Sequence, residues 1–211
     1  MATATAPASF QVETSTRSLG YNLPQRLGQA LWLPMLGIAL VLFGAGMALG
    51  IVRADEIADG GAADTIASLQ HVQAGVMFLG FASVFAAISF AIARILGQFR
   101  SGGGEVQAAA KRTVQTLRMP ATAKLFLALM AMALMTLVVA SILHLVFAAG
   151  IENTSASLAD AEDRFVVLEG VRRLGVALFL FAILLGLATI IRVLRFQAVR
   201  LQQLPGEEPV S

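Results

Sequence analysis

The two histidines are the side chains in this sequence best suited to bind a metal or to exchange a proton. They are His71 and His144, and the chain has no cysteine. His144 lies inside a long apolar segment, and His71 directly precedes another. Imidazole changes charge near neutral pH and is a common metal ligand. An ionisable side chain within a membrane-spanning segment is a functional candidate by default.

The distances of the histidines from basic residues along the chain predict that both lie at a similar depth. His71 is 23 residues from Arg94, or roughly 34 Å along a helix, and His144 is 20 residues from Lys124, or roughly 30 Å. Two imidazoles at one depth on neighbouring helices suit the axial ligation of a b-type haem. The alternative is hydrogen bonding alone, with His71 in interfacial water and His144 donating to a carbonyl or to Ser141.

The elements that must position these histidines are four long apolar segments. None contains Asp, Glu, Lys or Arg, and each is long enough to cross about 30 Å of hydrocarbon as a helix. The chain is 57% hydrophobic and 13% charged, whereas soluble domains carry about 25% charged residues. The sequence therefore predicts an all-α membrane protein with transmembrane helices at 31–52, 72–93, 125–151 and 174–191.

The charges flanking these segments predict the orientation of the chain. Eleven of the fifteen basic residues precede the first segment, lie between the second and third, or follow the fourth. Nine of the thirteen acidic residues fall in the two other loops. Because basic residues resist translocation, both termini are predicted in the cytoplasm of a bacterial inner (plasma) membrane, with both acidic loops outside.

The remaining segments are predicted to be tails and loops. The N-terminal tail, 1–30, is partly disordered, the outer loops are 53–71 and 152–173, and the C-terminal tail is 192–211. The basic inner loop, 94–124, contains a flexible linker at 101–104 and a short amphipathic helix at 105–118. Its Lys111, Arg112 and Arg118 would contact anionic lipids of the inner leaflet; the alternative is a solvated loop helix. Asp160 with Arg164, and Glu169 with Arg173, form predicted ion pairs one helical turn apart.

An internal repeat at an offset of about 100 residues predicts two tandem hairpins with the same orientation. Gly75 aligns with Gly175, Phe81 with Phe181, and Ala82 with Ala182. Parallel repeats are related by an axis along the membrane normal. Small residues spaced by four allow close helix approach, either within one bundle or between subunits. The candidate helix-packing positions are Gly46, Gly50, Ala82, Ala86, Ala182 and Gly186.

Several classes of function lack their expected residues. No carboxylate lies within an apolar segment, so the usual proton or sodium relay of an ion-coupled transporter is missing. The sequence contains no phosphate-binding loop, nucleophile elbow or zinc motif. The positive net charge follows from membrane topology, and no nucleic-acid-binding signature accompanies it.

The sequence therefore favours a non-catalytic accessory, assembly or scaffold subunit that acts through helix packing, as a homo-oligomer or within a larger membrane complex. The first alternative is an electron-transfer subunit that binds haem b through His71 and His144. The second is a pore or facilitator for an uncharged solute, lined by hydroxyl side chains: Ser83, Ser89, Thr136, Ser141 and Thr189.

Overall fold

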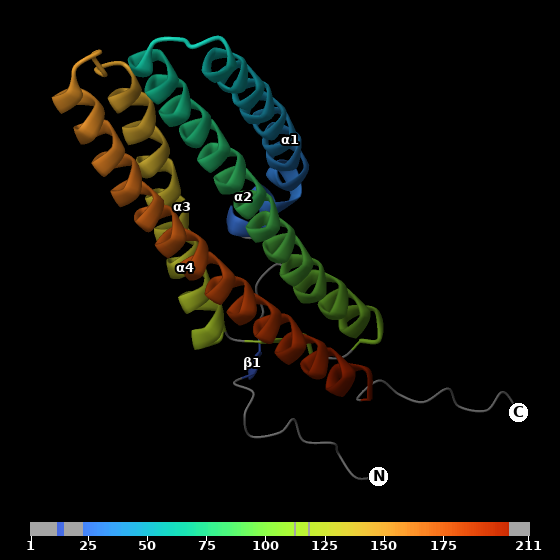
Figure 1. The fold of residues 1–211 in the computed structure, drawn as a ribbon. Coiled ribbons are helices and arrows are strands. Elements are labelled where there is room, and N and C mark those ends of the chain that lie inside the picture. The colour runs from blue at the N-terminus through green and yellow to red at the C-terminus, as the bar shows by residue number, and fades with distance from the viewer. Residues whose placement is uncertain (1–11, 15–22, 112, 118, 203–211) are drawn as a thin grey trace, which may run out of the picture. The chain divides into compact units, whose positions relative to one another are not determined.

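The computed structural model describes residues 12–14, 23–111, 113–117 and 119–202. In chain order the elements are β1 (Val12–Thr14), α1 (Leu23–Ala58), α2 (Ala63–Ala109), β2 (Gln115–Leu117), α3 (Ala121–Ala148) and α4 (Ser155–Gln202) (Figure 1). Within these described residues, four helices are long and apolar enough to cross a membrane, one for each predicted segment. Such helices are those of a multi-pass membrane protein.

α1, α2 and α4 extend well beyond their apolar segments, whereas α3 ends at Ala148, three residues before the predicted end of the third segment. Local capping explains where two of the helices meet their loops. α1 ends at Ala58 because Gly60 adopts a φ of 71° and the N–H groups of Gly60 and Gly61 bond back to the last turn. α4 begins at Ser155, where the hydroxyl of Thr154 accepts from the N–H of Ser157. The connections that remain between the paired helices are therefore short, 59–62 and 149–154.

The predicted linker and separate helix in the basic loop are wrong. α2 continues through 101–104 and ends at Ala109, and β2 occupies part of 105–118. At Gly103 any side chain would collide with Gln197 and Arg200 of α4. Glycine at this position therefore permits α2 and α4 to pack closely. Lys111 then adopts a φ of 52°, which turns the chain away from the helix.

The predicted N-terminal tail also contains structure. Val12–Thr14 pairs antiparallel with Gln115–Leu117, and Glu13 lies opposite Thr116. α1 begins at Leu23, inside the predicted tail, and Pro24 suits the first turn because its missing N–H would lack a helical partner there. Residues 1–11 and 15–22 of that tail lie outside the described residues.

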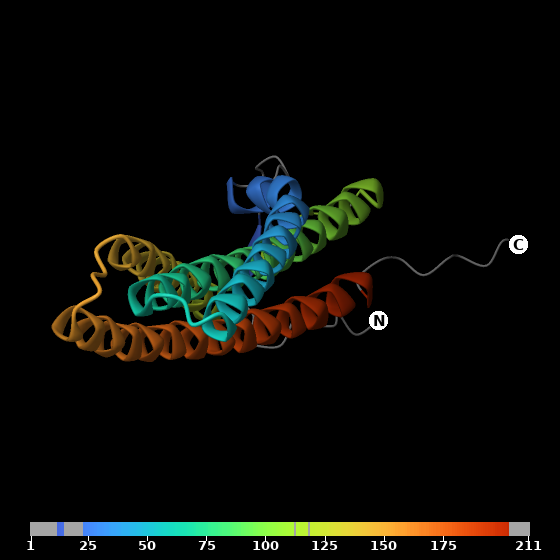
Figure 2. The same ribbon diagram turned by 45° about the horizontal axis from the view of Figure 1, so that its top comes forward.

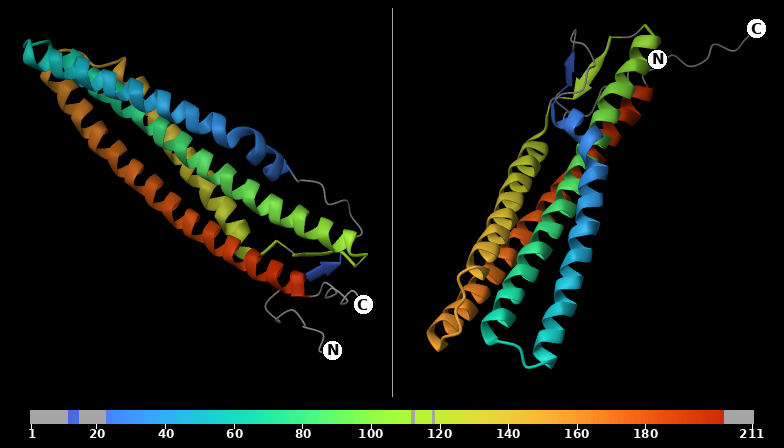
Figure 3. Two further views of the ribbon diagram at one scale, coloured as in Figure 1. Left: turned by 90° about the vertical axis from the view of Figure 1, so that its right-hand side faces the viewer. Right: turned by 90° about the horizontal axis from the view of Figure 1, so that it is seen from above.

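The chain divides into two compact units, and each helix contributes to both. The loop-end unit comprises 31–88 and 128–181, and the terminal unit comprises 1–30, 89–127 and 182–211. Within the loop-end unit, the connections 59–62 and 149–154 lie at the same end in every view (Figures 1, 2 and 3). This unit is a four-helix bundle in which α1 lies beside α2 at one edge (Figure 3).

The core of the loop-end unit follows a stripe of buried residues along each helix. On α2 the stripe runs through His71, Phe78 and Ala82, which are 2%, 1% and 3% exposed. On α3 it includes Ala140 and His144, both fully buried. Spacings of three and four residues keep a helix face turned to its neighbours. Both histidines therefore belong to the core-facing stripe.

Candidate functional site: a buried histidine pair

The fold brings His71 of α2 and His144 of α3 into direct contact. Their Nδ1 atoms are 2.9 Å apart, which is a hydrogen-bonding distance, and their ring centroids are 5.0 Å apart. Both side chains are buried, at 2% and 0% exposure. This contact differs from the hydrogen-bonding alternative considered above, because His71 is buried rather than in interfacial water, and His144 bonds to His71 rather than to a carbonyl or to Ser141.

A backbone carbonyl assigns the hydrogen positions of the pair. Nε2 of His71 lies 3.0 Å from the carbonyl oxygen of Ala161 on α4. Because a carbonyl only accepts, Nε2 of His71 must carry the hydrogen. In the neutral ring, Nδ1 of His71 is then bare and accepts from Nδ1–H of His144. The two bonds join α2, α3 and α4 through one side chain.

Glycine and aromatic side chains complete the enclosure of the pair. A methyl group at Gly75 would lie 3.1 Å from the carbonyl oxygen of Ser141 and 3.2 Å from Cβ of His144, so α2 and α3 approach closely here. The ring of Phe78 stands edge-on to His144, and the ring of Phe165 stands edge-on to both imidazoles. Within the pair itself, Nε2 of His144 is buried and has no hydrogen-bond partner in the described structure.

Two arginines of α4 near the pair, Arg164 and Arg172, each form an ion pair. Arg164 and Asp160 form the predicted ion pair at 2.5 Å. Glu169 pairs with Arg172 at 2.6 Å rather than with Arg173, which corrects the prediction. Residues three apart are also neighbours on a helix, and Arg172 gains a cation–π contact with the ring of Phe78, 5.2 Å away.

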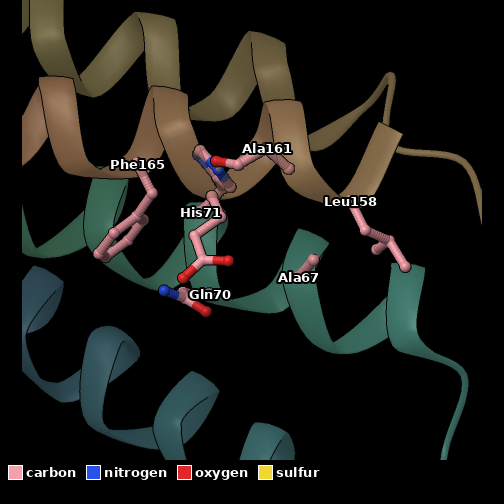
Figure 4. A pocket seen from close by; sticks show the side chains of 7 residues that line it. Ala67, Gln70, His71, Leu158, Ala161 and Phe165 are labelled. Atoms are coloured by element: carbon pink, nitrogen blue, oxygen red, sulfur yellow. Dashed lines mark hydrogen bonds between the residues drawn. The ribbon is translucent and has the colours of Figure 1, made fainter. Parts of the chain in front are cut away.

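A small pocket opens beside His71, with a volume of about 200 Å³. Figure 4 shows His71 on α2 facing Ala161 on α4, with Phe165 on one side and Leu158 on the other. The polar lining comes from His71, Gln70 and Glu162. Oε1 of Gln70 accepts a hydrogen bond from Arg53 of α1 at 3.0 Å. The pocket therefore reaches the edge of the histidine pair at the loop end of the bundle.

The six small residues named as packing positions all point into the chain itself. Ala82, Ala86 and Ala182 are buried. A methyl group at Gly46 would lie 2.5 Å from Sδ of Met77, and one at Gly50 would lie 2.7 Å from Nε2 of Gln73. At Gly186 it would lie 3.0 Å from Cδ1 of Ile92. These positions serve close approach within the chain.

The remaining candidate residues do not converge on a site. Lys111 is exposed after the end of α2, whereas Arg112 and Arg118 lie outside the described residues. Four of the five hydroxyl residues proposed to line a pore donate to the carbonyl four residues earlier in their own helix: Ser83, Thr136, Ser141 and Thr189. This hydrogen bonding gives the pore alternative no support.

A second buried polar cluster, which the sequence analysis missed, lies in the terminal unit. Arg200 of α4 is 3% exposed. Its Nε and one terminal nitrogen donate to Oε1 of Gln107 on α2 at 3.0 and 2.9 Å, and its other terminal nitrogen donates to Oε1 of Gln197 at 3.2 Å. The same Gln107 oxygen accepts from the N–H of Gln115. We call Arg200, Gln107 and Gln197 the arginine cluster.

Comparison with protein-family models, with curated proteins and with solved structures found no match for this chain. In the described part of the chain, no three side chains among His, Cys, Asp and Glu gather as a metal-binding group.

Proposed function

We propose that this chain is a non-catalytic protein of a bacterial inner membrane that serves as an accessory, assembly or scaffold subunit. The observation that carries the proposal is the exposure of α1. Of its most apolar 18-residue window, 11% is buried, compared with 39% for α2. α1 therefore presents most of its apolar surface to lipid or to another subunit.

The face of α1 that packs within the chain is directed at α2. The rings of Phe43 and Phe81 meet edge to face with centroids 5.2 Å apart, and Gly46 lies against Met77. One turn further on, Gly50 lies against Gln73. The GxxxG pair of α1 is thus already engaged inside the subunit.

A second small-residue stripe lies on the exposed face of α1. Gly37 and Gly44, seven residues apart, have no atom within 4 Å of where a side chain would begin. Val41 and Met47 on the same face are 72% and 69% exposed. In a bilayer such a surface suits close packing of another helix, because small residues let backbones approach. We propose that a helix of a second copy or of a partner subunit packs here.

We propose the orientation that the charge asymmetry supports, with both termini in the cytoplasm and both short loops outside. The basic region that contains Lys111, Arg112 and Arg118 would then meet anionic headgroups of the inner leaflet, each charge contributing about 1 kcal/mol. The tandem arrangement of the two hairpins, α1–α2 and α3–α4, is part of the same proposal. The short connections at one end of the loop-end unit support it.

Disulfide mapping of α1 tests the subunit interface directly, because the chain has no natural cysteine. We expect Gly37→Cys and Gly44→Cys to form disulfide-linked dimers in native membranes, or adducts with a co-purifying partner. Ala39→Cys is the matched control, since Ala39 lies on the same helix but is fully buried. The proposal fails if none of the exposed positions cross-links and the protein is monomeric in native membranes.

A second candidate, a haem-b electron-transfer subunit, is favoured by one observation: folding brings both histidines together. In this structure their Nδ1 atoms bond to each other at 2.9 Å. Two metal–nitrogen bonds of about 2.0–2.1 Å on opposite sides of an ion would require a separation of about 4 Å. The rings would therefore have to move apart. A Soret band in purified protein, lost in both single alanine variants, would support this candidate, and a flat spectrum would reject it.

A further inference from the structure

The number of hydrogens that the histidine pair can hold follows from its contacts. Two neutral imidazoles carry two ring hydrogens on four nitrogens. One hydrogen lies on Nε2 of His71, where it meets the carbonyl of Ala161. The other occupies the short contact between the two Nδ1 atoms. In the neutral pair the fourth nitrogen, Nε2 of His144, is therefore bare.

A third hydrogen has only one place to go. The Nδ1–Nδ1 contact holds one hydrogen, because two would point at each other across 2.9 Å. Nε2 of His71 already carries one. The added hydrogen must reside on Nε2 of His144, whichever ring formally carries the charge. That atom is fully buried and has no partner in the described structure, and a buried atom of this kind calls for a functional explanation.

The charges around the pair differ from helix to helix. From α1, Arg53 binds Gln70; from α4, Glu162 lines the pocket, Arg164 pairs with Asp160, and Arg172 pairs with Glu169. Within the described parts of α2 and α3 at this level, the histidines are the ionisable groups. A proton on the pair therefore adds a positive charge near Arg164 and Arg172. The carboxylates that pair with these arginines also lie on α4.

We propose that His71 and His144 act as one proton-binding site, which takes up a single proton as a unit and holds the added hydrogen on Nε2 of His144. The pocket beside His71 gives the other end of the pair contact with the loop-end surface. Hydrogen on Nε2 of His71 therefore exchanges with solvent sooner than hydrogen on Nε2 of His144. The inference does not depend on any partner of α1.

The test uses the intact protein in lipid nanodiscs with 15N-labelled imidazole rings. Because the chain has two histidines, the spectrum contains four ring-nitrogen signals. Above the midpoint we expect two protonated and two bare nitrogens, with scalar coupling between the two Nδ1 signals. On titration from about pH 8 to about pH 4, all four signals should shift at one shared midpoint, as coupled groups do. Nε2 of His144 should gain the hydrogen.

His144→Asn is the matched variant, because the asparagine amide can still donate to Nδ1 of His71 but has no atom in place of Nε2. We expect His71 in this variant to keep its hydrogen on Nε2 and to titrate as a single independent group. Two independent midpoints in the wild type, absence of the Nδ1–Nδ1 coupling, or rings that do not titrate at all would each overturn the proposal. A variant that misfolds leaves the wild-type titration as the deciding measurement.

Discussion

The loop-end unit and the terminal unit each bury one polar cluster, which is neutral in the loop-end unit and positively charged in the terminal unit. In the loop-end unit two neutral rings share a hydrogen, and one nitrogen lacks a partner. In the terminal unit a permanent cation, Arg200, donates from all three guanidinium nitrogens to the oxygens of Gln107 and Gln197. Each cluster links α2 to α4 in its own unit.

The two clusters differ in whether their central side chains can change protonation state. Imidazole can gain or lose a proton, whereas guanidinium stays charged. The amide oxygens around Arg200 are fixed acceptors, so that cluster is suited to holding helices together. The incomplete hydrogen bonding of the histidine pair is what makes it the better candidate for function, because a fully satisfied network has no reason to change.

The largest expected effect comes from removing the acceptor of the buried cation. Gln107→Leu leaves Nε and a terminal nitrogen of Arg200 without a partner, and also the N–H of Gln115. We expect a loss of about 3 kcal/mol in the free energy of unfolding, measured in mixed micelles. The double variant Gln107→Leu/Arg200→Met removes donor and acceptor together and should be less destabilised than Gln107→Leu alone. An additive double variant would show that the arginine cluster does not act as a unit.

The histidine pair should give smaller and unequal effects. His144→Phe removes one neutral hydrogen bond and the unpartnered nitrogen, and the new ring meets Phe78 and Phe165, so we expect a loss of about 1 kcal/mol. His71→Phe removes both hydrogen bonds of the His71 ring and leaves Nδ1–H of His144 without an acceptor, whereas the carbonyl of Ala161 keeps its bond within α4. This variant should cost more, about 2 kcal/mol. The same unfolding measurement compares them. Equal losses would mean that the bond to Ala161 contributes nothing.

The spacing of residues along the sequence predicts part of this arrangement. The four helices and the similar depth of His71 and His144 follow from apolar segment length and distance to the flanking basic residues. On α4 the buried residues fall on a stripe with a spacing of seven, which faces the core: Ala161, Leu168, Ala182, Thr189 and Phe196. Reading the apolar segments as uniformly hydrophobic concealed that stripe.

What the sequence could not supply is which faces meet. The direct contact of the two histidines depends on how α2 and α3 are rotated, and Gly75 permits that contact through its lack of a side chain. At Gly103 the sequence-based prediction was wrong, because three consecutive glycines favour a flexible linker when judged by helix propensity alone. All three glycines are nevertheless helical, and Gly103 packs closely against Gln197 and Arg200. Local preference yields to tertiary contact at both positions.

The smallest effect is expected where charge lies at the surface of the loop-end unit. Asp160 and Arg164 are 56% and 46% exposed, and their ion pair is accordingly screened by solvent. We expect Asp160→Asn to change the free energy of unfolding by less than about 1 kcal/mol, and less still at high salt. Arg164 keeps its contact with the ring of Phe147, 4.6 Å away, in this variant.

A loss from Asp160→Asn as large as that from Gln107→Leu would remove the distinction between the two units, since surface charge would then stabilise the loop end as strongly as buried charge stabilises the terminal unit. The informative control is Glu169→Gln, whose ion pair with Arg172 is less exposed, at 22% and 30%. Because burial reduces screening, this variant should cost more than Asp160→Asn. That ordering follows from charge and burial together: the arginine is charged and buried, the histidine pair is neutral and buried, and the ion pair of Asp160 with Arg164 is charged but exposed.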